Sequence, residues 1–249
     1  MKTEPHKKIV VTNRLLMLNQ MAGPLFRELA EDISVKFPKK SELYTGHPDT
    51  LKFIDKIETL KITKSPLYNR KSKITRILSW LKYTWFAFFK IMFASKGTLI
   101  FIVSNPPLIG PLAWFVSKIR RLTYVVLVYD MHPDTMISFG VFREDSIPVR
   151  VWRFINKHVW EGASAVYTIG DVMAEKLTEQ FDVNKTQLKY VGVIPPWADT
   201  ENIKPIEKSL NPLANELGQL DCTTVLYSGN MGISHDIDSM LKAAVLLKG

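Results

Sequence analysis

The sequence predicts an α/β fold built around a parallel sheet. Short, uninterrupted apolar runs that end at turn residues alternate along the chain with longer segments of helical periodicity. Strands that are apolar on both faces need helices on both sides of the sheet. The chain has 249 residues, of which 46% are hydrophobic and 23% charged, values typical of a globular protein. We therefore expect a doubly wound domain over residues 1–200 and exclude disordered, collagen-like and membrane-bundle proteins.

The first half of this domain begins with a short apolar run and a proline-led helix. The run at 9–12 is expected to be a strand, and the turn at 19–24 leads into a helix near 25–32, with Pro24 suited to its first turn. Further strands are expected at 43–45, 98–103 and 124–129, and further helices at 77–93 and 112–118.

The second half continues the alternation of helices and strands. The sequence predicts helices at 155–161 and 171–180, the latter capped by Asp171, and strands at 165–169 and 188–193. A linker is expected over 201–221, with helical potential near 213–217. A new strand at 223–227 and a helix from Asp236 would then begin a second domain over 222–249. One such strand and helix cannot bury their own faces, so either they join the first sheet or a second domain continues.

The charge of +9 is concentrated in one segment. Residues 59–129 contain twelve Lys or Arg and no Asp or Glu. This indicates a partner with phosphates, either a nucleic acid or an anionic membrane surface, although a solvated basic face without a partner is also compatible. The single cysteine, Cys222, permits no internal disulfide, and a reduced cytosolic setting is expected.

The helix expected over 77–93 carries more aromatic surface than one buried face requires. With the basic residues that precede it, this helix could lie in the headgroup region of a membrane, and Lys82, Trp85 and Phe89 are its predicted membrane contacts. The alternative is a core helix that packs on two sides. Nucleic acid is not expected as the partner, because the aromatic residues share a helix and do not lie on a strand surface.

Ligands of open parallel sheets bind beyond the carboxyl ends of the strands, so the residues that follow strands are the candidate site. One such loop contains Asp130, His132 and Asp134 directly after an apolar strand. Asp130 could hold a hydroxyl or a developing positive charge, and His132 could donate to a phosphate or hydroxyl. The loop could equally be a plain turn in which Asp134 caps the next helix. Neither a metal site nor a Ser-His-Asp or Cys-His pair is predicted.

A second candidate loop follows the strand expected at 223–227. Gly229, Asn230 and Gly232 lie between this strand and a helix, where backbone amides can approach a phosphate, although a tight turn would look the same.

Taken in order, several stretches resemble the amino-terminal part of a family 4 retaining glycosyltransferase of the GT-B fold, in the bacterial branch that acts in polysaccharide assembly. They are Ser104-Asn105-Pro106-Pro107, the 130–133 turn, residues 163–170, Val193-Ile194-Pro195-Pro196-Trp197-Ala198-Asp199 and Tyr227-Ser228-Gly229-Asn230-Met231-Gly232. The resemblance departs from the family at Tyr129, where many relatives carry His, and at Asn230, where many carry Arg.

The resemblance implies two Rossmann-like domains, of which the second is only begun here, and a retaining, hexosyl-type transferase. The donor would be a nucleotide-sugar and the acceptor a lipid-linked saccharide of cell-surface polysaccharide biosynthesis, at the inner face of the cell membrane. No metal or other cofactor is expected. By the same resemblance Gly23, Gly229, Asn230 and Gly232 would bind the donor, Asn105 and Asp134 the acceptor, and Asp130 and His132 would be catalytic.

The family's remaining donor residues would follow residue 249, so we expect this chain alone to have little or no transferase activity. Two other classes of function stay open on the sequence. One is a non-catalytic membrane-docking or partner-binding module that retains the acceptor-domain fold. The other is a nucleic-acid-binding protein whose affinity comes from the positive charge.

Overall fold

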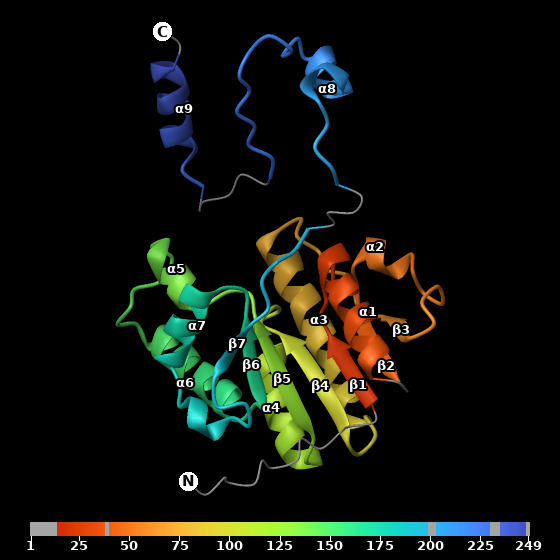
Figure 1. Ribbon diagram of the computed structural model, residues 1–249. Coiled ribbons are helices and arrows are strands. Elements are labelled where there is room, and N and C mark those ends of the chain that lie inside the picture. The colour runs from red at the N-terminus through yellow and green to blue at the C-terminus, as the bar shows by residue number, and fades with distance from the viewer. Residues whose placement is uncertain (1–13, 38–39, 199–202, 230–234, 248–249) are drawn as a thin grey trace, which may run out of the picture. The chain divides into compact units, whose positions relative to one another are not determined.

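The computed structural model describes residues 14–37, 40–198, 203–229 and 235–247. The chain divides into two compact units. The first comprises Met1–Ile137 and Phe142–Pro196, and the second comprises Ser138–Val141 and Trp197–Gly249. The sheet lies in the first unit (Figure 1).

The first unit is built around a parallel sheet, and seven strands of it lie in the described residues. In the order β3-β2-β1-β4-β5-β6-β7, every neighbouring pair is parallel. The strands are β1 (Arg14–Leu18), β2 (Ser41–Thr45), β3 (Leu60–Lys64), β4 (Thr98–Val103), β5 (Thr123–Val128), β6 (Ala165–Thr168) and β7 (Val191–Val193). This confirms the predicted α/β fold with a parallel sheet. The strand order reverses between β1 and β4, which is where ligands bind in such sheets.

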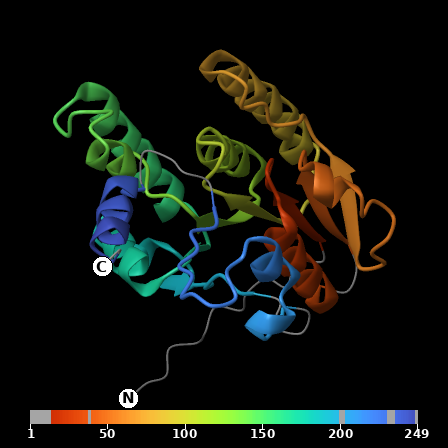
Figure 2. The same ribbon diagram turned by 90° about the horizontal axis from the view of Figure 1, so that it is seen from above.

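Helices cover both faces of the sheet, as Figures 1 and 2 show. One face carries α1, and the other carries α3, α4, α6 and α7. The helices of this unit are α1 (Pro24–Lys36), α2 (Pro48–Leu51), α3 (Lys73–Met92), α4 (Ile109–Arg120), α5 (Asp134–Ser138), α6 (Ile147–Glu161), α7 (Asp171–Thr178) and the 3₁₀ turn η1 (Val183–Lys185); α5 ends inside the short stretch assigned to the second unit.

The two faces of β1 show how the core forms. Successive strand side chains point to opposite faces. Leu16 and Leu18 accordingly pack in the cluster that includes Tyr83 of α3, whereas Leu15 and Met17 pack in the cluster that includes Phe26 of α1. All four β1 side chains are almost fully buried. An apolar strand with both faces covered agrees with the predicted fold class, although the sequence analysis expected the first strand at 9–12 and none at 14–18.

Most of the expected elements are present with shifted ends. The strand at 98–103 has the predicted bounds, and the other strands and helices predicted between 25 and 193 differ by up to eight residues at an end. The strand β3 was not predicted, because its Leu-Lys-Ile-Thr-Lys sequence alternates apolar and polar residues in the middle of the basic segment. The strand expected at 9–12 lies outside the described residues.

Two predictions of local structure are wrong. Gly170 occupies the capping position of α7, and Asp171 lies one residue later, in the first turn, where a carboxylate still interacts favourably with the helix dipole. The strand expected at 223–227 is absent, and Val225 and Leu226 are 89% and 76% exposed. The described part of the second unit offers no neighbouring strand, so an extended segment there has no backbone partner.

The described part of the second unit is helical where it is regular. It contains the 3₁₀ turn η2 (Lys208–Leu210), α8 (Pro212–Glu216) and α9 (Ile237–Leu246). The helices expected near 213–217 and from 236 are therefore present, with shifted ends. Across the helices that the structure describes in both units, none combines the length and the hydropathy needed to cross a bilayer.

Candidate functional site

The carboxyl ends of β1, β2, β4 and β5 form one edge of the first unit, and the segments that leave this edge contain five of the predicted site residues. The loop after β1 holds Gly23, and the loop after β4 holds Asn105. The loop after β5 holds Asp130 and His132, and Asp134 follows as the first residue of α5. Since β1 and β4 are neighbours in the sheet, the loops that follow them emerge side by side. Within the first unit, these predicted residues therefore lie at one edge of the sheet.

Ser104 ties the loops after β4 and β5 together. Its Oγ accepts hydrogen bonds from the backbone N–H of Tyr129 at 3.0 Å and of Asp130 at 3.4 Å. The Tyr129 ring is packed at the side of the sheet that carries α1, and burial raises the pKa of its phenol to about 12. The phenol is therefore neutral at physiological pH. Asp130 itself is exposed, so its carboxylate is open to a ligand.

His132 and Asp130 line one small cavity beside β4 and β5. The cavity has a volume of about 30 Å³, enough for one or two water molecules, and Ser104, Trp152 and Asn156 also line it. The His132 ring lies 5.9 Å from the Trp152 ring, and Asn156 Nδ2 donates to the His132 carbonyl oxygen at 2.6 Å. Among the described residues, the buried Nδ1 of His132 has no hydrogen-bond partner. Asn156 thus holds the backbone of His132, and the imidazole keeps one polar atom without a partner among the described residues.

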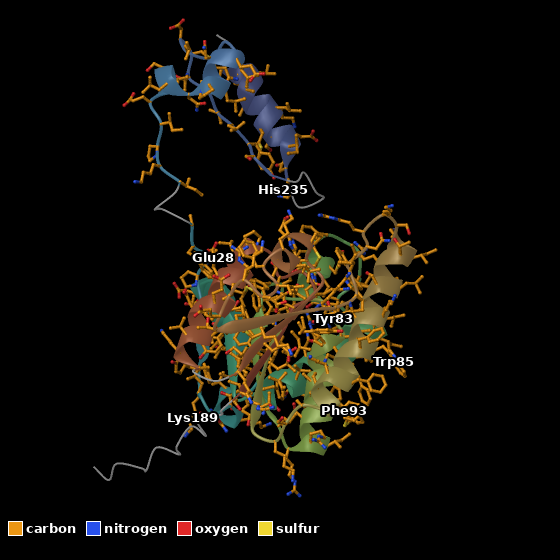
Figure 3. All side chains as sticks on the ribbon, turned by 90° about the vertical axis from the view of Figure 1, so that its right-hand side faces the viewer. Glu28, Tyr83, Trp85, Phe93, Lys189 and His235 are labelled. Carbon is orange, nitrogen blue, oxygen red and sulfur yellow. The ribbon has the colours of Figure 1, made fainter. Side chains whose placement is uncertain are left out.

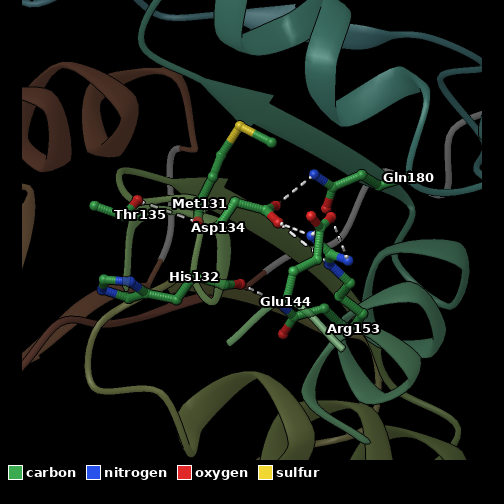
Figure 4. Close-up of polar contacts among 8 residues, drawn as sticks. Met131, His132, Asp134, Thr135, Glu144, Arg153 and Gln180 are labelled. Carbon is green, nitrogen blue, oxygen red and sulfur yellow. Dashed lines mark hydrogen bonds and ion pairs between the residues drawn. The ribbon is translucent and has the colours of Figure 1, made fainter. Parts of the chain in front are cut away.

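Asp134 has its carboxylate engaged by two other elements (Figure 4). Its Oδ1 accepts from Arg153 Nη2 at 2.5 Å and from Arg153 Nε at 3.2 Å, and its Oδ2 accepts from Gln180 Nε2 at 2.7 Å. These bonds raise the pKa of the Arg153 guanidinium, with Glu144 adding to the effect. In Figure 4 the His132 ring and the Asp134 carboxylate point in opposite directions from the loop. Asp134 is therefore placed to fix the loop that carries Asp130 and His132.

On the β1 side of the edge, a buried glutamine organises the loop that ends at Gly23. Gln20 is 1% exposed, and its Nε2 donates to the backbone oxygens of Pro66 and Ser79 at 3.2 and 3.1 Å. Gly23 precedes Pro24 at the amino terminus of α1. A Cβ built on Gly23 would lie 3.7 Å from His47 Nε2. His47 follows β2, so the loops after β1 and β2 meet beside the α1 terminus.

Other predicted residues lie elsewhere. Gly229 belongs to the second unit, so its sharing of a crevice with Gly23 and Asp130 stays a prediction. Asn230 and Gly232 lie outside the described residues. Lys82, Trp85 and Phe89 lie on α3 and are exposed.

The sequence analysis did not identify several residues of the edge. His47, Gln20, Asn156, Arg153 and Gln180 reach it from separate elements, and their roles depend on contacts between residues 19 to 59 positions apart. The position of His47 could have identified it as a candidate, because it lies in the loop after the strand predicted at 43–45.

The groups at this edge can form hydrogen bonds to a ligand and can stabilise charge on it. It combines an exposed carboxylate, a partly buried imidazole and the amino terminus of a 13-residue helix whose free N–H groups favour an anion. Among the described residues, no group of three His, Cys, Asp or Glu side chains is placed to hold a metal ion.

Comparison with known proteins gives two informative similarities. The chain is 23% identical over 155 residues to the probable glycosyltransferase WbjE of Pseudomonas aeruginosa, which covers 62% of this chain and 38% of the relative. It superposes with a TM-score of 0.51 on the crystal structure of Anabaena Alr3699/HepE in complex with UDP-glucose, at 15% identity, covering 84% of this chain and 50% of that one. No protein-family model matches the chain.

These similarities establish the fold. The chain has the α/β architecture of the GT-B glycosyltransferases. It spans well under two thirds of the length of either protein that it resembles.

Proposed function

We propose that this chain forms part of a glycosyltransferase that moves a sugar from a nucleotide-sugar to a lipid-linked saccharide. The observation that carries the proposal is the carboxyl edge of the sheet, where Asp130 and His132, in the loop after β5, line one cavity. The similarity to WbjE and the fold shared with a UDP-glucose complex support the same class of reaction.

The chemistry of sugar transfer fits the groups on this edge. Cleavage of a sugar–phosphate bond leaves a negatively charged diphosphate, which a helix amino terminus and hydrogen-bond donors stabilise without a metal. The amino terminus of α1 at Gly23 supplies such a site in the first unit, and Gly229, Asn230 and Gly232 would supply the rest. Asp130 would accept a hydrogen bond from a hydroxyl at the reacting centre, and His132 would donate to a hydroxyl or phosphate. Asn105 would contact the acceptor, and Asp134 would hold the loop.

The proposal places the enzyme at the inner face of the cell membrane, where lipid-linked acceptors reside. The helix α3 supports this location because its solvent side is apolar: Trp85 is 63% exposed, and Phe93, directly after the helix, is 79% exposed. Figure 3 shows both rings on the outer side of α3 and Tyr83 directed into the protein. Lys82, Trp85 and Phe89 would contact the lipid. We further propose that the enzyme is a hexosyl-type transferase, that the anomeric configuration is retained and that the pathway builds cell-surface polysaccharide.

The test uses cells that make the protein from its own gene, so that any further sequence is present. Membranes from these cells are incubated with radiolabelled UDP-glucose and then with other nucleotide-sugars, and label is counted in the lipid extract. We expect incorporation that is lost when the gene is deleted and strongly reduced by Asp130→Asn. The control is Asp145→Asn, an exposed carboxylate paired only with Arg143 among its described neighbours. Unchanged incorporation in the deletion strain with every donor would contradict the proposal.

A further inference from the structure

A groove lies at the opposite edge of the sheet from the candidate site. It has a volume of about 610 Å³, within the range of small-molecule sites. It is lined by the amino-terminal ends of β1, β2 and β3 and by the last turns of α3. Parallel strands of five residues separate the two edges by roughly 15 Å. The groove, which we call the amino-edge groove, is therefore distinct from the site of the proposed reaction.

The charge of the amino-edge groove is strongly positive. Arg14, Lys40, Lys61 and Lys90 line it, against the single carboxylate of Glu42. Lys90 Nζ lies 2.6 Å from Glu42 Oε1, and Arg14 Nη1 donates to the neutral Ser95 hydroxyl. In the part of the chain that the structure describes, no ion pair is formed by Lys40 or Lys61, and both are exposed. Among the described residues, the three cationic side chains of Arg14, Lys40 and Lys61 thus remain without a compensating carboxylate in the groove.

The opposite wall of the groove is aromatic and continuous with the apolar side of α3. Phe86, Phe89 and Phe93 line the groove, and they are 47%, 37% and 79% exposed. Trp85 and Phe89 pack edge to face at 5.2 Å, and the Phe89 and Phe93 rings stack at 6.3 Å. A site with cations on one wall and exposed aromatic rings on the other matches a molecule whose phosphate adjoins hydrocarbon.

We propose that the amino-edge groove binds the phosphate of an anionic phospholipid headgroup, with the acyl chains against Phe89 and Phe93. This inference rests on the proposed membrane location and adds to it a defined headgroup site away from the sugar-transfer edge. A second copy of this chain is a poorer occupant, because residues 59–129 carry twelve basic and no acidic residues and two such surfaces repel each other.

The test compares two double charge reversals in the purified 249-residue chain. Lys40→Glu/Lys61→Glu alters the groove, and Lys157→Glu/Lys176→Glu makes the same charge change on α6 and α7. Sedimentation with vesicles of phosphatidylcholine, with or without phosphatidylglycerol, measures binding. We expect the groove variant to bind the anionic vesicles at least tenfold more weakly than wild type and the control variant to stay within about threefold. Lys40→Gln/Lys61→Gln repeats the comparison without reversed charge, and circular dichroism checks folding.

The outcomes separate the two proposals. Equal losses in the groove and control variants would overturn the groove as the site and leave the membrane location standing. If the wild type bound neither kind of vesicle, both the groove site and the membrane location would be overturned. The result of the transferase assay would not be affected. Soluble glycerol phosphate should displace the protein from vesicles only in large excess. Displacement at concentrations equal to the lipid would show that a free phosphate is the occupant, and dimers that dissociate on Phe93→Ser would show that a second copy is.

Discussion

Asp134 illustrates how a single carboxylate can hold a reactive loop in place. It accepts hydrogen bonds from Arg153 of α6 and from Gln180, which follows α7, while the neighbouring His132 ring points the other way (Figure 4). Its side chain is 30% exposed and that of Arg153 is 40% exposed, so solvent weakens the pair. A positioning function for Asp134 follows from this geometry more directly than a contact with the acceptor.

We expect Asp134→Asn to lower the free energy of unfolding by about 1 kcal/mol, since charge-assisted hydrogen bonds are lost at a partly exposed position. The same change should reduce sugar incorporation by displacing Asp130 and His132. Urea unfolding and the membrane assay measure the two effects. Arg143→Ala, which breaks a far more exposed pair with Asp145, should change neither. Full activity of Asp134→Asn would show that the loop needs no anchor.

Gln20 has a comparable structural function on the β1 side of the edge, but in a buried environment. Gln20→Ala would leave the backbone oxygens of Pro66 and Ser79 without their side-chain donor. We expect a loss of about 1–3 kcal/mol in the free energy of unfolding, the range for buried polar groups left unpaired. Differential scanning calorimetry measures it. Gln219→Ala, in the second unit, is the control, and an equal effect of both changes would argue against the proposed function of Gln20.

The helix α3 has two apolar sides in different environments. Tyr83, Ala87 and Ile91 face the sheet and are fully buried, whereas Trp85 and Phe93 face outward and are exposed. The exposed side explains why the sequence pattern left two interpretations open, core helix or membrane helix. The structure shows that one side packs in the core and that the other remains uncovered in the first unit.

Two neighbouring substitutions distinguish these sides. Ile91→Ala should cost about 2–5 kcal/mol of unfolding free energy, as cavities in a core do, with vesicle binding per folded molecule unchanged. Phe93→Ser should leave stability within about 0.5 kcal/mol and weaken vesicle binding. Thermal unfolding and vesicle sedimentation are the measurements. If Phe93→Ser instead destabilised the protein strongly, its ring would have to be covered.

The strands show which parts of the fold could be predicted. The strand β4 was found with its observed bounds because Thr98 and five apolar residues lie between a glycine and a turn, whereas β3 was missed because edge strands alternate with polar residues. The site residues likewise fall into those that the sequence could predict and those that it could not. Asp130 and His132 follow a recognisable strand, but Gln20, Arg153 and Gln180 act through side chains distant in sequence. No local pattern encodes such contacts, which exist only once the sheet has formed.

The first unit as a whole buries several phenols, and this predicts its behaviour at high pH. Burial, with Glu42 adding to it, raises the pKa of Tyr44 to about 12, and burial alone raises that of Tyr129 to about 12. Burial, with Tyr44 adding to it, raises the pKa of Tyr83 well above its usual value. Because these phenols ionise more readily in the unfolded chain, their contribution to stability is complete below pH 10. It is lost as the pH rises from 10 through 12.

Unfolding free energy should therefore be nearly constant from pH 7 to about 9 and decline above pH 10. Tyr44→Phe keeps the ring that stacks on Tyr83 at 5.7 Å and removes one buried phenol, so the decline should become shallower. Tyr190→Phe, which removes an exposed phenol, is the matched control. Urea unfolding of the three proteins between pH 7 and 11 measures the slopes. Parallel curves for wild type and Tyr44→Phe would mean that this phenol ionises as easily in the folded protein as in the unfolded chain, and that the packing between α3 and the sheet is open to water.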